Sequence, residues 1–257
     1  MATALITGGT AGIGAAFARA LAARGDDLVL VARNADRLSD MATELKERYA
    51  VNVETVVADL AIRADVAGIA ERLTSLEQPI DMVINNAGFG VRAKLTDADT
   101  TRHEQAIDVM IRAVLMLGAA AGRTMRQRGS GTIINVSSTA GFVAMGSYSA
   151  IKAWVTTYTE SLANELHGTG VRVTALCPGY VRTEFHERAG INMGSLPQLM
   201  WLDADRLVAD CLNDAAAGKV VSIPSKRYKV MITICEDRKS TRLNSSHYQP
   251  SRMPSSA

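Results

Sequence analysis

The sequence is poor in cysteine, and its cysteines are far apart. The 257 residues include Cys177, Cys211 and Cys235, with no C-x-x-C pair. This spacing provides neither a disulfide framework nor a cysteine-based zinc site, and it suits a reducing compartment. His103 and His167 also lack the spacing of metal ligands, so no metal site is expected.

A secretory leader and a long hydrophobic run are missing as well. The longest apolar run, AVLMLGAAAG (113–122), is far shorter than the roughly 20 residues that a membrane-spanning helix needs. No basic segment followed by an apolar one opens the chain. Charged residues make up 21% and apolar residues 47%, which excludes a disordered chain and is typical of a globular one. We therefore expect a cytoplasmic protein with no membrane partner.

Short apolar runs alternate with helical patterns through most of the chain. Strands are expected at TALIT, DLVLVAR, VETVVADL, DMVINNAG, GTIINVSS, VRVTALCPG and KVVSIPS, with helical segments between them. This alternation predicts βαβ units. We expect a single α/β domain with a doubly wound, mostly parallel sheet of about seven strands and helices on both faces.

The end of the chain does not fit this body. Residues 237–257 are polar, rich in serine and without periodicity, which predicts a disordered tail. Residues 237–247, DRKSTRLNSSH, resemble the translation of a common sequencing-library adapter, so we interpret the tail as non-native and the native C-terminus as truncated after residue 236. Without the tail, 24 basic and 25 acidic residues remain, a formal charge of −1 rather than +2. The basic balance is therefore no argument for a nucleic-acid partner.

A glycine-rich turn follows the first apolar run, in the stretch LITGGTAGIG. Glycines at the start of a helix let backbone N–H groups approach a pyrophosphate. The spacing is G-x-x-x-G-x-G rather than the G-x-G-x-x-G of the common dinucleotide fingerprint, and a loop that needs glycine only to turn is the alternative. The position of the turn favours a nucleotide site made by Gly8, Thr10, Gly12, Ile13 and Gly14.

The end of the second apolar run bears on which nucleotide binds. An acidic residue there would bond the ribose 2′-hydroxyl of NAD, whereas this run ends in Ala32 and Arg33. A guanidinium suits a 2′-phosphate, so Arg33 favours NADP, with NAD the less favoured cofactor.

Four stretches together resemble one family, the short-chain dehydrogenase/reductases. They are TGGTAGIG (7–14), NNAG (85–88), NVSS (135–138) with YSAIK (148–152), and CPGYVRT (177–183), in the order that the family has them. The resemblance covers residues 1–236. It implies a Rossmann-like fold, an NAD(P)-dependent oxidoreductase acting on CH–OH or C=O groups, and a homodimer or homotetramer.

The resemblance also implies roles for individual residues. The catalytic residues would be Ser138, Tyr148 and Lys152, with Ser137 as the alternative serine. The cofactor would be held by the glycine loop, Arg33, Tyr148 and Lys152, together with Asp59, Asn86, Ala87, Gly88, Pro178, Gly179 and Thr183.

Elementary chemistry agrees with the catalytic roles. A free phenol has a pKa near 10, and we expect the ammonium of Lys152, one helical turn away, to favour the phenolate and lower the pKa of Tyr148. Ser138 can hydrogen-bond a substrate carbonyl. The family commonly has an asparagine where this sequence has Met110, whose plainer interpretation is helix packing.

The segment EFHERAGINMGSLPQLMWL (184–202) lies where relatives carry a lid over the substrate. Its apolar residues predict either a pocket cover for a fairly hydrophobic ketone or aldehyde, or ordinary core packing. Two alternatives to an NADP-dependent reductase stay open at this point. They are an NAD-preferring alcohol dehydrogenase and a non-catalytic dinucleotide sensor on the same fold.

Overall fold

The structure is a computed structural model, and it describes residues 1–185 and 197–234. The expected tail at 237–257 lies outside the described residues. So does much of the expected pocket cover, including Ile191, Met193 and Leu196.

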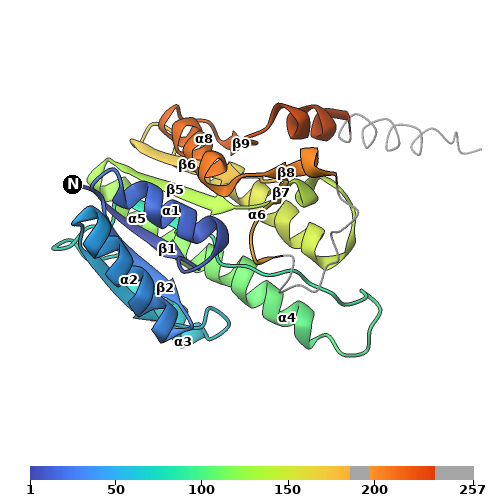
Figure 1. The fold of residues 1–257 in the computed structure, drawn as a ribbon. Coiled ribbons are helices and arrows are strands. Elements are labelled where there is room, and N and C mark those ends of the chain that lie inside the picture. The colour runs from blue at the N-terminus through green and yellow to red at the C-terminus, as the bar shows by residue number, and fades with distance from the viewer. Residues whose placement is uncertain (186–196, 235–257) are drawn as a thin grey trace, which may run out of the picture.

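A parallel sheet of seven strands forms the centre of the protein (Figure 1). Its order is β3 (Val53–Val57), β2 (Asp27–Ala32), β1 (Thr3–Thr7), β4 (Met82–Asn85), β5 (Gly131–Val136), β6 (Val171–Leu176) and β9 (Val221–Ser222). Every neighbouring pair is parallel. The expected doubly wound sheet is confirmed. The strand order reverses between β1 and β4, and in such sheets ligands bind in the crevice at the carboxyl ends of the strands flanking this point.

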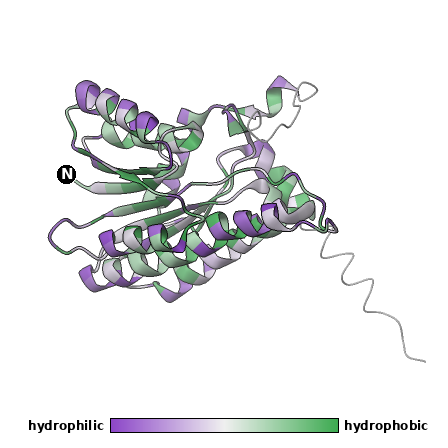
Figure 2. Ribbon diagram, turned by 90° about the horizontal axis from the view of Figure 1, so that it is seen from below, coloured by the Kyte–Doolittle hydropathy of each residue, from purple (hydrophilic) through white to green (hydrophobic). Residues whose placement is uncertain are grey.

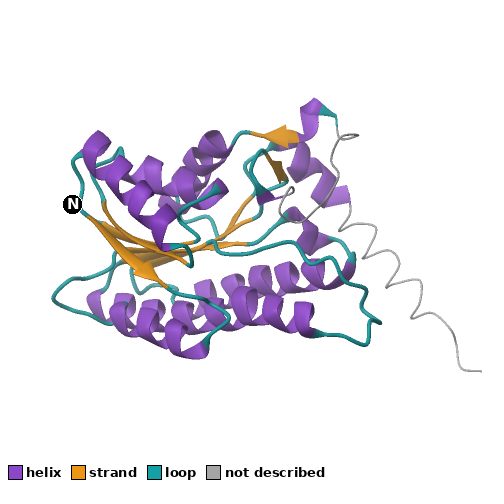
Figure 3. Cartoon of the chain, turned by 60° about the horizontal axis from the view of Figure 1, so that its bottom comes forward, coloured by secondary structure: helices purple, strands orange, loops and turns teal. Residues whose placement is uncertain are grey.

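Helices cover both faces of the sheet, as Figure 3 shows. One face carries α1 (Gly12–Ala22), α2 (Ala35–Tyr49) and α8 (Ala204–Ala216), and the other carries α3 (Arg63–Arg72), α4 (Thr101–Ile107), α5 (Ala113–Arg128) and α6 (Gly146–Glu165). The strands carry apolar side chains on both sides: Leu30 belongs to the core under α1 and α2, and Val29 to the core under α3 and α5. Figure 2 shows hydrophobic residues concentrated in these strands.

The helices begin and end where local chemistry favours it. The side chain of Asn34 accepts a hydrogen bond from the backbone N–H of Arg37 at 2.8 Å and caps α2, and Asp203 caps α8 through Arg206 at 2.9 Å. Gly129 ends α5 at φ 72°, a left-handed conformation that glycine adopts without strain.

One long helix passes through α4 and α5 without a break. The turn between them, Asp108–Arg112, is π-helical. The continuous helix Thr101–Arg128 is long and apolar enough to cross a membrane by length and composition, yet half of its most apolar window is buried inside the protein. It packs on the sheet as a core helix does.

Several short elements were not expected from the sequence. They are the 3₁₀ turns Thr139–Phe142 and Gln198–Met200, the strand pair β7 (Tyr180–Val181) and β8 (Trp201–Leu202), and a helix at 226–234. Tyr228 joins three of these segments, because its hydroxyl accepts from the N–H of Tyr180 at 3.1 Å and donates to the carbonyl of Met200 at 2.8 Å. These contacts build the wall beside the carboxyl ends of β5 and β6.

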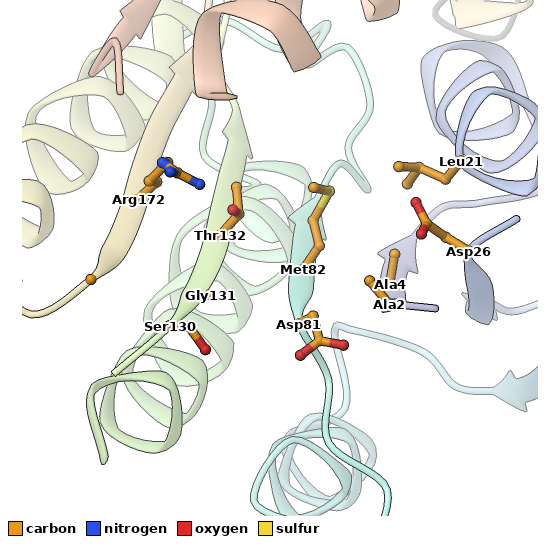
Figure 4. Close-up of a pocket in the computed structure, with 11 residues that line it drawn as sticks. Ala2, Ala4, Leu21, Asp26, Asp81, Met82, Ser130, Gly131, Thr132 and Arg172 are labelled. Carbon is orange, nitrogen blue, oxygen red and sulfur yellow. The ribbon is translucent and has the colours of Figure 1, made fainter. Parts of the chain in front are cut away.

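The amino edge of the sheet holds a hollow of about 340 Å³, lined among others by Asp26, Met82, Thr132 and Arg172 (Figure 4). Asp81 at this edge accepts from the N–H of Thr3 at 3.0 Å. None of the site residues expected from the sequence lines this hollow.

Candidate active site

The predicted site residues meet in one cleft of about 1240 Å³. Its lining includes Gly8, Thr10, Gly12, Ile13, Arg33, Asp59, Asn86, Ala87, Gly88, Ser138, Tyr148, Lys152, Pro178, Gly179 and Thr183. Of the predicted residues, Gly14 alone does not line it. Segments from both halves of the chain therefore form a single site at the carboxyl ends of the strands.

Gly14 has a structural reason to be glycine. A Cβ on Gly14 would lie 2.2 Å from the carbonyl oxygen of Gly8, closer than any real contact. Gly8 and Gly12 have φ values of +68° and +51°, in the left-handed region. The turn thus brings backbone against the first turn of α1, which is the arrangement that binds a phosphate.

Polar side chains tie the glycine loop to the end of β4. The hydroxyl of Thr7 accepts from the N–H of Asn86 at 3.0 Å and of Ala87 at 3.1 Å, and the Asn86 amide donates to the carbonyl of Thr7 at 2.9 Å. These bonds hold the two strands that flank the reversal in strand order. Thr7 was not expected from the sequence, although its place directly before the glycines was a usable signal.

Two arginines near the carboxyl end of β2 line the cleft. Arg33 follows β2, its side chain is 70% exposed, and its Nη1 lies 3.8 Å from Oδ2 of Asp59. Arg37 was not predicted from the sequence as a site residue. Its Nη2 atom lies 3.1 Å from Oε1 of Glu184. The wall around a ribose would therefore carry two guanidinium groups, each paired with a carboxylate.

The three predicted catalytic residues come from β5 and α6. Tyr148 and Lys152 are one turn apart on α6, and Nζ of Lys152 lies 5.7 Å from the centre of the Tyr148 ring. Lys152 is 4% exposed and donates to the carbonyl of Val136 at 2.8 Å. Tyr148 shares a hydrogen bond with Ser138, which directly follows β5. A phenol, a hydroxyl and an ammonium thus converge on the same part of the cleft.

Burial, rather than Lys152, controls the acidity of Tyr148. Burial raises the pKa of Tyr148 to about 12, opposed by the hydrogen bond to Ser138. Burial also lowers the pKa of Lys152 to about 8. The pKa of Tyr148 is therefore raised rather than lowered as expected, because removal from water disfavours the phenolate.

The two serines after β5 have different surroundings. Ser137 is 2% exposed, and its hydroxyl lies 2.7 Å from both the carbonyl of Lys152 and the hydroxyl of Thr156. Ser138 is partly exposed and accepts from the N–H of Ala140 at 3.1 Å. Ser137 is therefore bound to the backbone of α6, while Ser138 keeps its contact with Tyr148.

Met110 fills the space next to Lys152. It is 1% exposed and lies in the π-helical turn. A Cβ on Gly88 would be 3.0 Å from the Met110 sulfur and 3.8 Å from Nζ of Lys152. An apolar thioether therefore packs next to Lys152, in agreement with the helix-packing interpretation of Met110, and π-turns of this kind are frequent at functional sites.

The described lining of the cleft also carries a set of apolar side chains. It includes Phe89, Val91, Phe142, Val143, Met145, Phe185, Met231 and Ile232. The ring centre of Phe185 lies 6.0 Å from that of Tyr148. Met231 and Ile232 belong to the helix 226–234, which no motif in the sequence indicated. Among the residues that the structure describes, no cluster of His, Cys, Asp and Glu could hold a metal ion.

Comparison with known proteins identifies the family. The family model for short chain dehydrogenases matches residues 2–193, well over half of the chain. The chain belongs to the short-chain dehydrogenases. This dehydrogenase is 36% identical over 183 residues to an uncharacterized oxidoreductase of Staphylococcus saprophyticus, covering 70% of this chain and 78% of the relative. An uncharacterized oxidoreductase of Staphylococcus aureus is 37% identical with the same coverage.

Solved structures share the whole fold of this dehydrogenase. A short-chain dehydrogenase from Sphingobium yanoikuyae in complex with NADPH has a TM-score of 0.85 and 33% identity, and the match covers 100% of both chains. A bulky-bulky ketone specific alcohol dehydrogenase from Comamonas testosteroni has a TM-score of 0.79 and 29% identity, with 99% of this chain and 97% of that chain covered. The predicted family, the fold class and an oxidoreductase of CH–OH or C=O groups that binds NAD(P) are therefore confirmed.

Proposed function

We propose that this dehydrogenase reduces a fairly hydrophobic ketone or aldehyde with NADPH, and oxidises the corresponding alcohol in reverse. One observation carries the proposal. The same cleft has a glycine loop and Arg33 at one end and Tyr148, Ser138 and an apolar wall at the other. The similar enzyme in complex with NADPH supports the choice of cofactor.

The residues of the cleft fit a dinucleotide. The glycine loop leaves its backbone free of side chains where a pyrophosphate would bind, and the N-terminus of α1 favours negative charge. Arg33 would bind the 2′-phosphate, Asp59 would lie near the adenine, and Pro178, Gly179 and Thr183 would hold the nicotinamide end. When bound, NADPH supplies the hydride that adds to the carbonyl carbon.

Tyr148 supplies the proton. Its hydroxyl proton passes to the carbonyl oxygen as the hydride reaches the carbon, which yields the alcohol and a phenolate that is reprotonated from solvent. With a pKa of about 12, Tyr148 is protonated throughout the ordinary pH range and can serve as the proton donor for reduction. Ser138 donates a hydrogen bond to the same carbonyl oxygen.

We propose an apolar substrate, a homodimer or homotetramer, and a cytoplasmic location. The apolar side chains beside Tyr148, such as Phe142, Phe185 and Ile232, support the first. Trp154 and Tyr158 stack at 4.9 Å on α6, and Leu115 on α5 is 45% exposed, which supports a self-association face on these two helices.

A dinucleotide sensor is the second candidate function, and Met110 is the observation that favours it. A buried thioether beside Lys152 cannot pass a proton onward. Turnover separates this candidate from an enzyme, and cofactor preference separates an NADP-dependent reductase from an NAD-preferring dehydrogenase.

The test is a panel of ketones, aldehydes and alcohols, each measured with NADPH or NADP and with NADH or NAD. We expect reduction of bulky apolar ketones with NADPH. Tyr148→Phe should lower kcat by about 10² to 10⁴ while leaving NADPH affinity in place. Tight NADPH binding without any turnover would favour the sensor, and a clear preference for NADH would contradict the role of Arg33.

A further inference from the structure

An ion pair spans the mouth of the cofactor cleft between Arg37 and Glu184. Nη2 of Arg37 lies 3.1 Å from Oε1 and 3.4 Å from Oε2 of Glu184, and Nη1 lies 3.5 Å from Oε2. The two residues are 147 positions apart in the chain, and both line the cleft. This contact therefore joins two walls of the site that the sequence does not connect.

Arg37 belongs to the wall of the cleft that also carries Arg33, where the adenosine ribose would bind. It lies in the first turn of α2, whose start is fixed by the bond from its N–H to the Asn34 side chain at 2.8 Å. Arg33 lies one residue before that cap and lines the same cleft. A 2′-phosphate bound at Arg33 would have Arg37 as the neighbouring guanidinium on this wall.

Glu184 belongs to a segment that contacts both other parts of the site. Thr183 lies against the glycine loop, because a Cβ on Gly12 would be 3.2 Å from its side chain. Phe185 donates its N–H to the hydroxyl of Thr183 at 3.3 Å and packs near the ring of Tyr148. Three successive residues thus touch the glycine loop, Arg37 and the catalytic tyrosine.

We propose that Glu184 competes with the 2′-phosphate of NADP(H) for Arg37, and so sets how strongly the protein prefers NADP over NAD. The inference rests on the proposed function. A guanidinium shared with a carboxylate offers fewer donors to a phosphate, and the carboxylate repels the phosphate dianion. NADH has a neutral hydroxyl at this position, which a carboxylate does not repel, so removing the charge of Glu184 should give NADH no gain in binding.

The size of the effect follows from the exposure of the pair. The side chains of Arg37 and Glu184 are 40% and 49% exposed, so solvent screens their attraction. Removing an exposed ion pair of this kind changes the equilibrium constant of the process it affects by about two- to five-fold. Glu184→Gln should therefore tighten NADPH binding by about two- to five-fold, and the gain should shrink at high salt.

The experiment is a set of direct titrations of NADPH and NADH, followed by nicotinamide fluorescence, with no substrate present. The variants are Glu184→Gln, Arg37→Gln and the double substitution, and Asp36→Asn is the matched control. Asp36 is an exposed carboxylate next to Arg37 in the sequence, without the ion pair. We expect tighter NADPH binding in Glu184→Gln, unchanged NADH binding, and no gain when Arg37 is already Gln.

Three outcomes would overturn the inference. They are an equal change for both cofactors, an equal gain in Asp36→Asn, and a gain that survives in the Arg37→Gln background. Failure of the proposed function looks different, because the unsubstituted protein would then prefer NADH or would bind NADPH without turning over any carbonyl substrate. Thermal unfolding without cofactor shows that each variant is folded, and Glu184→Asp, which keeps the charge, should bind NADPH like the unsubstituted protein.

Discussion

Lys152 is a buried charge, and replacing it by methionine tests whether burial lowers its pKa. The side chain is 4% exposed, and burial lowers its pKa from 10.5 to about 8. The charged form is therefore disfavoured in the folded protein relative to the unfolded chain. Lys152→Met removes the charge while keeping most of the volume. It also removes the hydrogen bond from Nζ to the carbonyl of Val136.

The sign and size of the effect follow from proton linkage. Between pH 8 and 10.5 the unfolded chain holds a proton on Lys152 that the folded protein has lost, so the contribution of this group to stability rises with pH. Relative to neutral lysine, the penalty is about 3 kcal/mol near pH 7 and about 1 kcal/mol near pH 9.5. The stability of Lys152→Met relative to the unsubstituted protein should therefore fall by about 2 kcal/mol over this range, whatever the lost hydrogen bond costs.

Urea unfolding at the two pH values, followed by tryptophan fluorescence and circular dichroism, measures this difference. Lys46→Met on the exposed side of α2 is the matched control, and its difference from the unsubstituted protein should stay flat with pH. Tyr148 and Cys177 are present in all three proteins, so their own titrations cancel to first order. If the stability of Lys152→Met relative to the unsubstituted protein instead stays constant or rises with pH, burial does not dominate the pKa of Lys152.

Other substitutions test the remaining assignments. Ser137→Ala should lower the free energy of unfolding by about 1–3 kcal/mol, because it leaves buried partners without a hydrogen bond, whereas Ser138→Ala should mainly lower kcat. Urea unfolding and turnover are measured for both variants. A loss of stability in Ser138→Ala together with a loss of kcat alone in Ser137→Ala would contradict this division. Arg33→Ser should weaken NADPH binding by about ten-fold or more and leave NADH binding unchanged in the same titrations. If Met110 only packs, Met110→Leu should lower the free energy of unfolding by less than about 1.5 kcal/mol and leave turnover within about two-fold. A large loss of kcat in a folded Met110→Leu protein would instead assign Met110 a role in the chemistry.

Most of the fold could be predicted because the central strands of the sheet are buried on both faces. Parallel strands of this kind read as short continuous apolar runs, such as TALIT for β1 and DLVLVA for β2, with amphipathic helices between them. The elements that escaped prediction lack such a signal. The pair β7 and β8 has two residues in each strand, and the helix at 226–234 has no motif beside it. Their positions depend on contacts such as those of Tyr228, which form only once distant segments meet.

The site divides in the same way between local pattern and distant contact. The glycine loop, Tyr148 and Lys152 belong to local patterns that the sequence alone reveals, and in the structure they line one cleft. Arg37 and Glu184 are individually unremarkable charged residues, and only the fold brings them together. The residues next to the two serines after β5 do not show which way either side chain points. The carbonyl that accepts the hydrogen bond from the Ser137 hydroxyl belongs to α6.

The acidity of Tyr148 shows what a spacing rule leaves out. Two groups one turn apart attract each other when charged, and this attraction alone would lower the pKa of the phenol. In the folded protein both groups are also withdrawn from water, which raises the pKa of Tyr148 to about 12 and lowers that of Lys152 to about 8. The same burial makes Tyr148 a proton donor at neutral pH and makes phenolate scarce. Reduction starts from the protonated phenol and oxidation from the phenolate, so the environment of α6 holds Tyr148 in the form from which reduction starts.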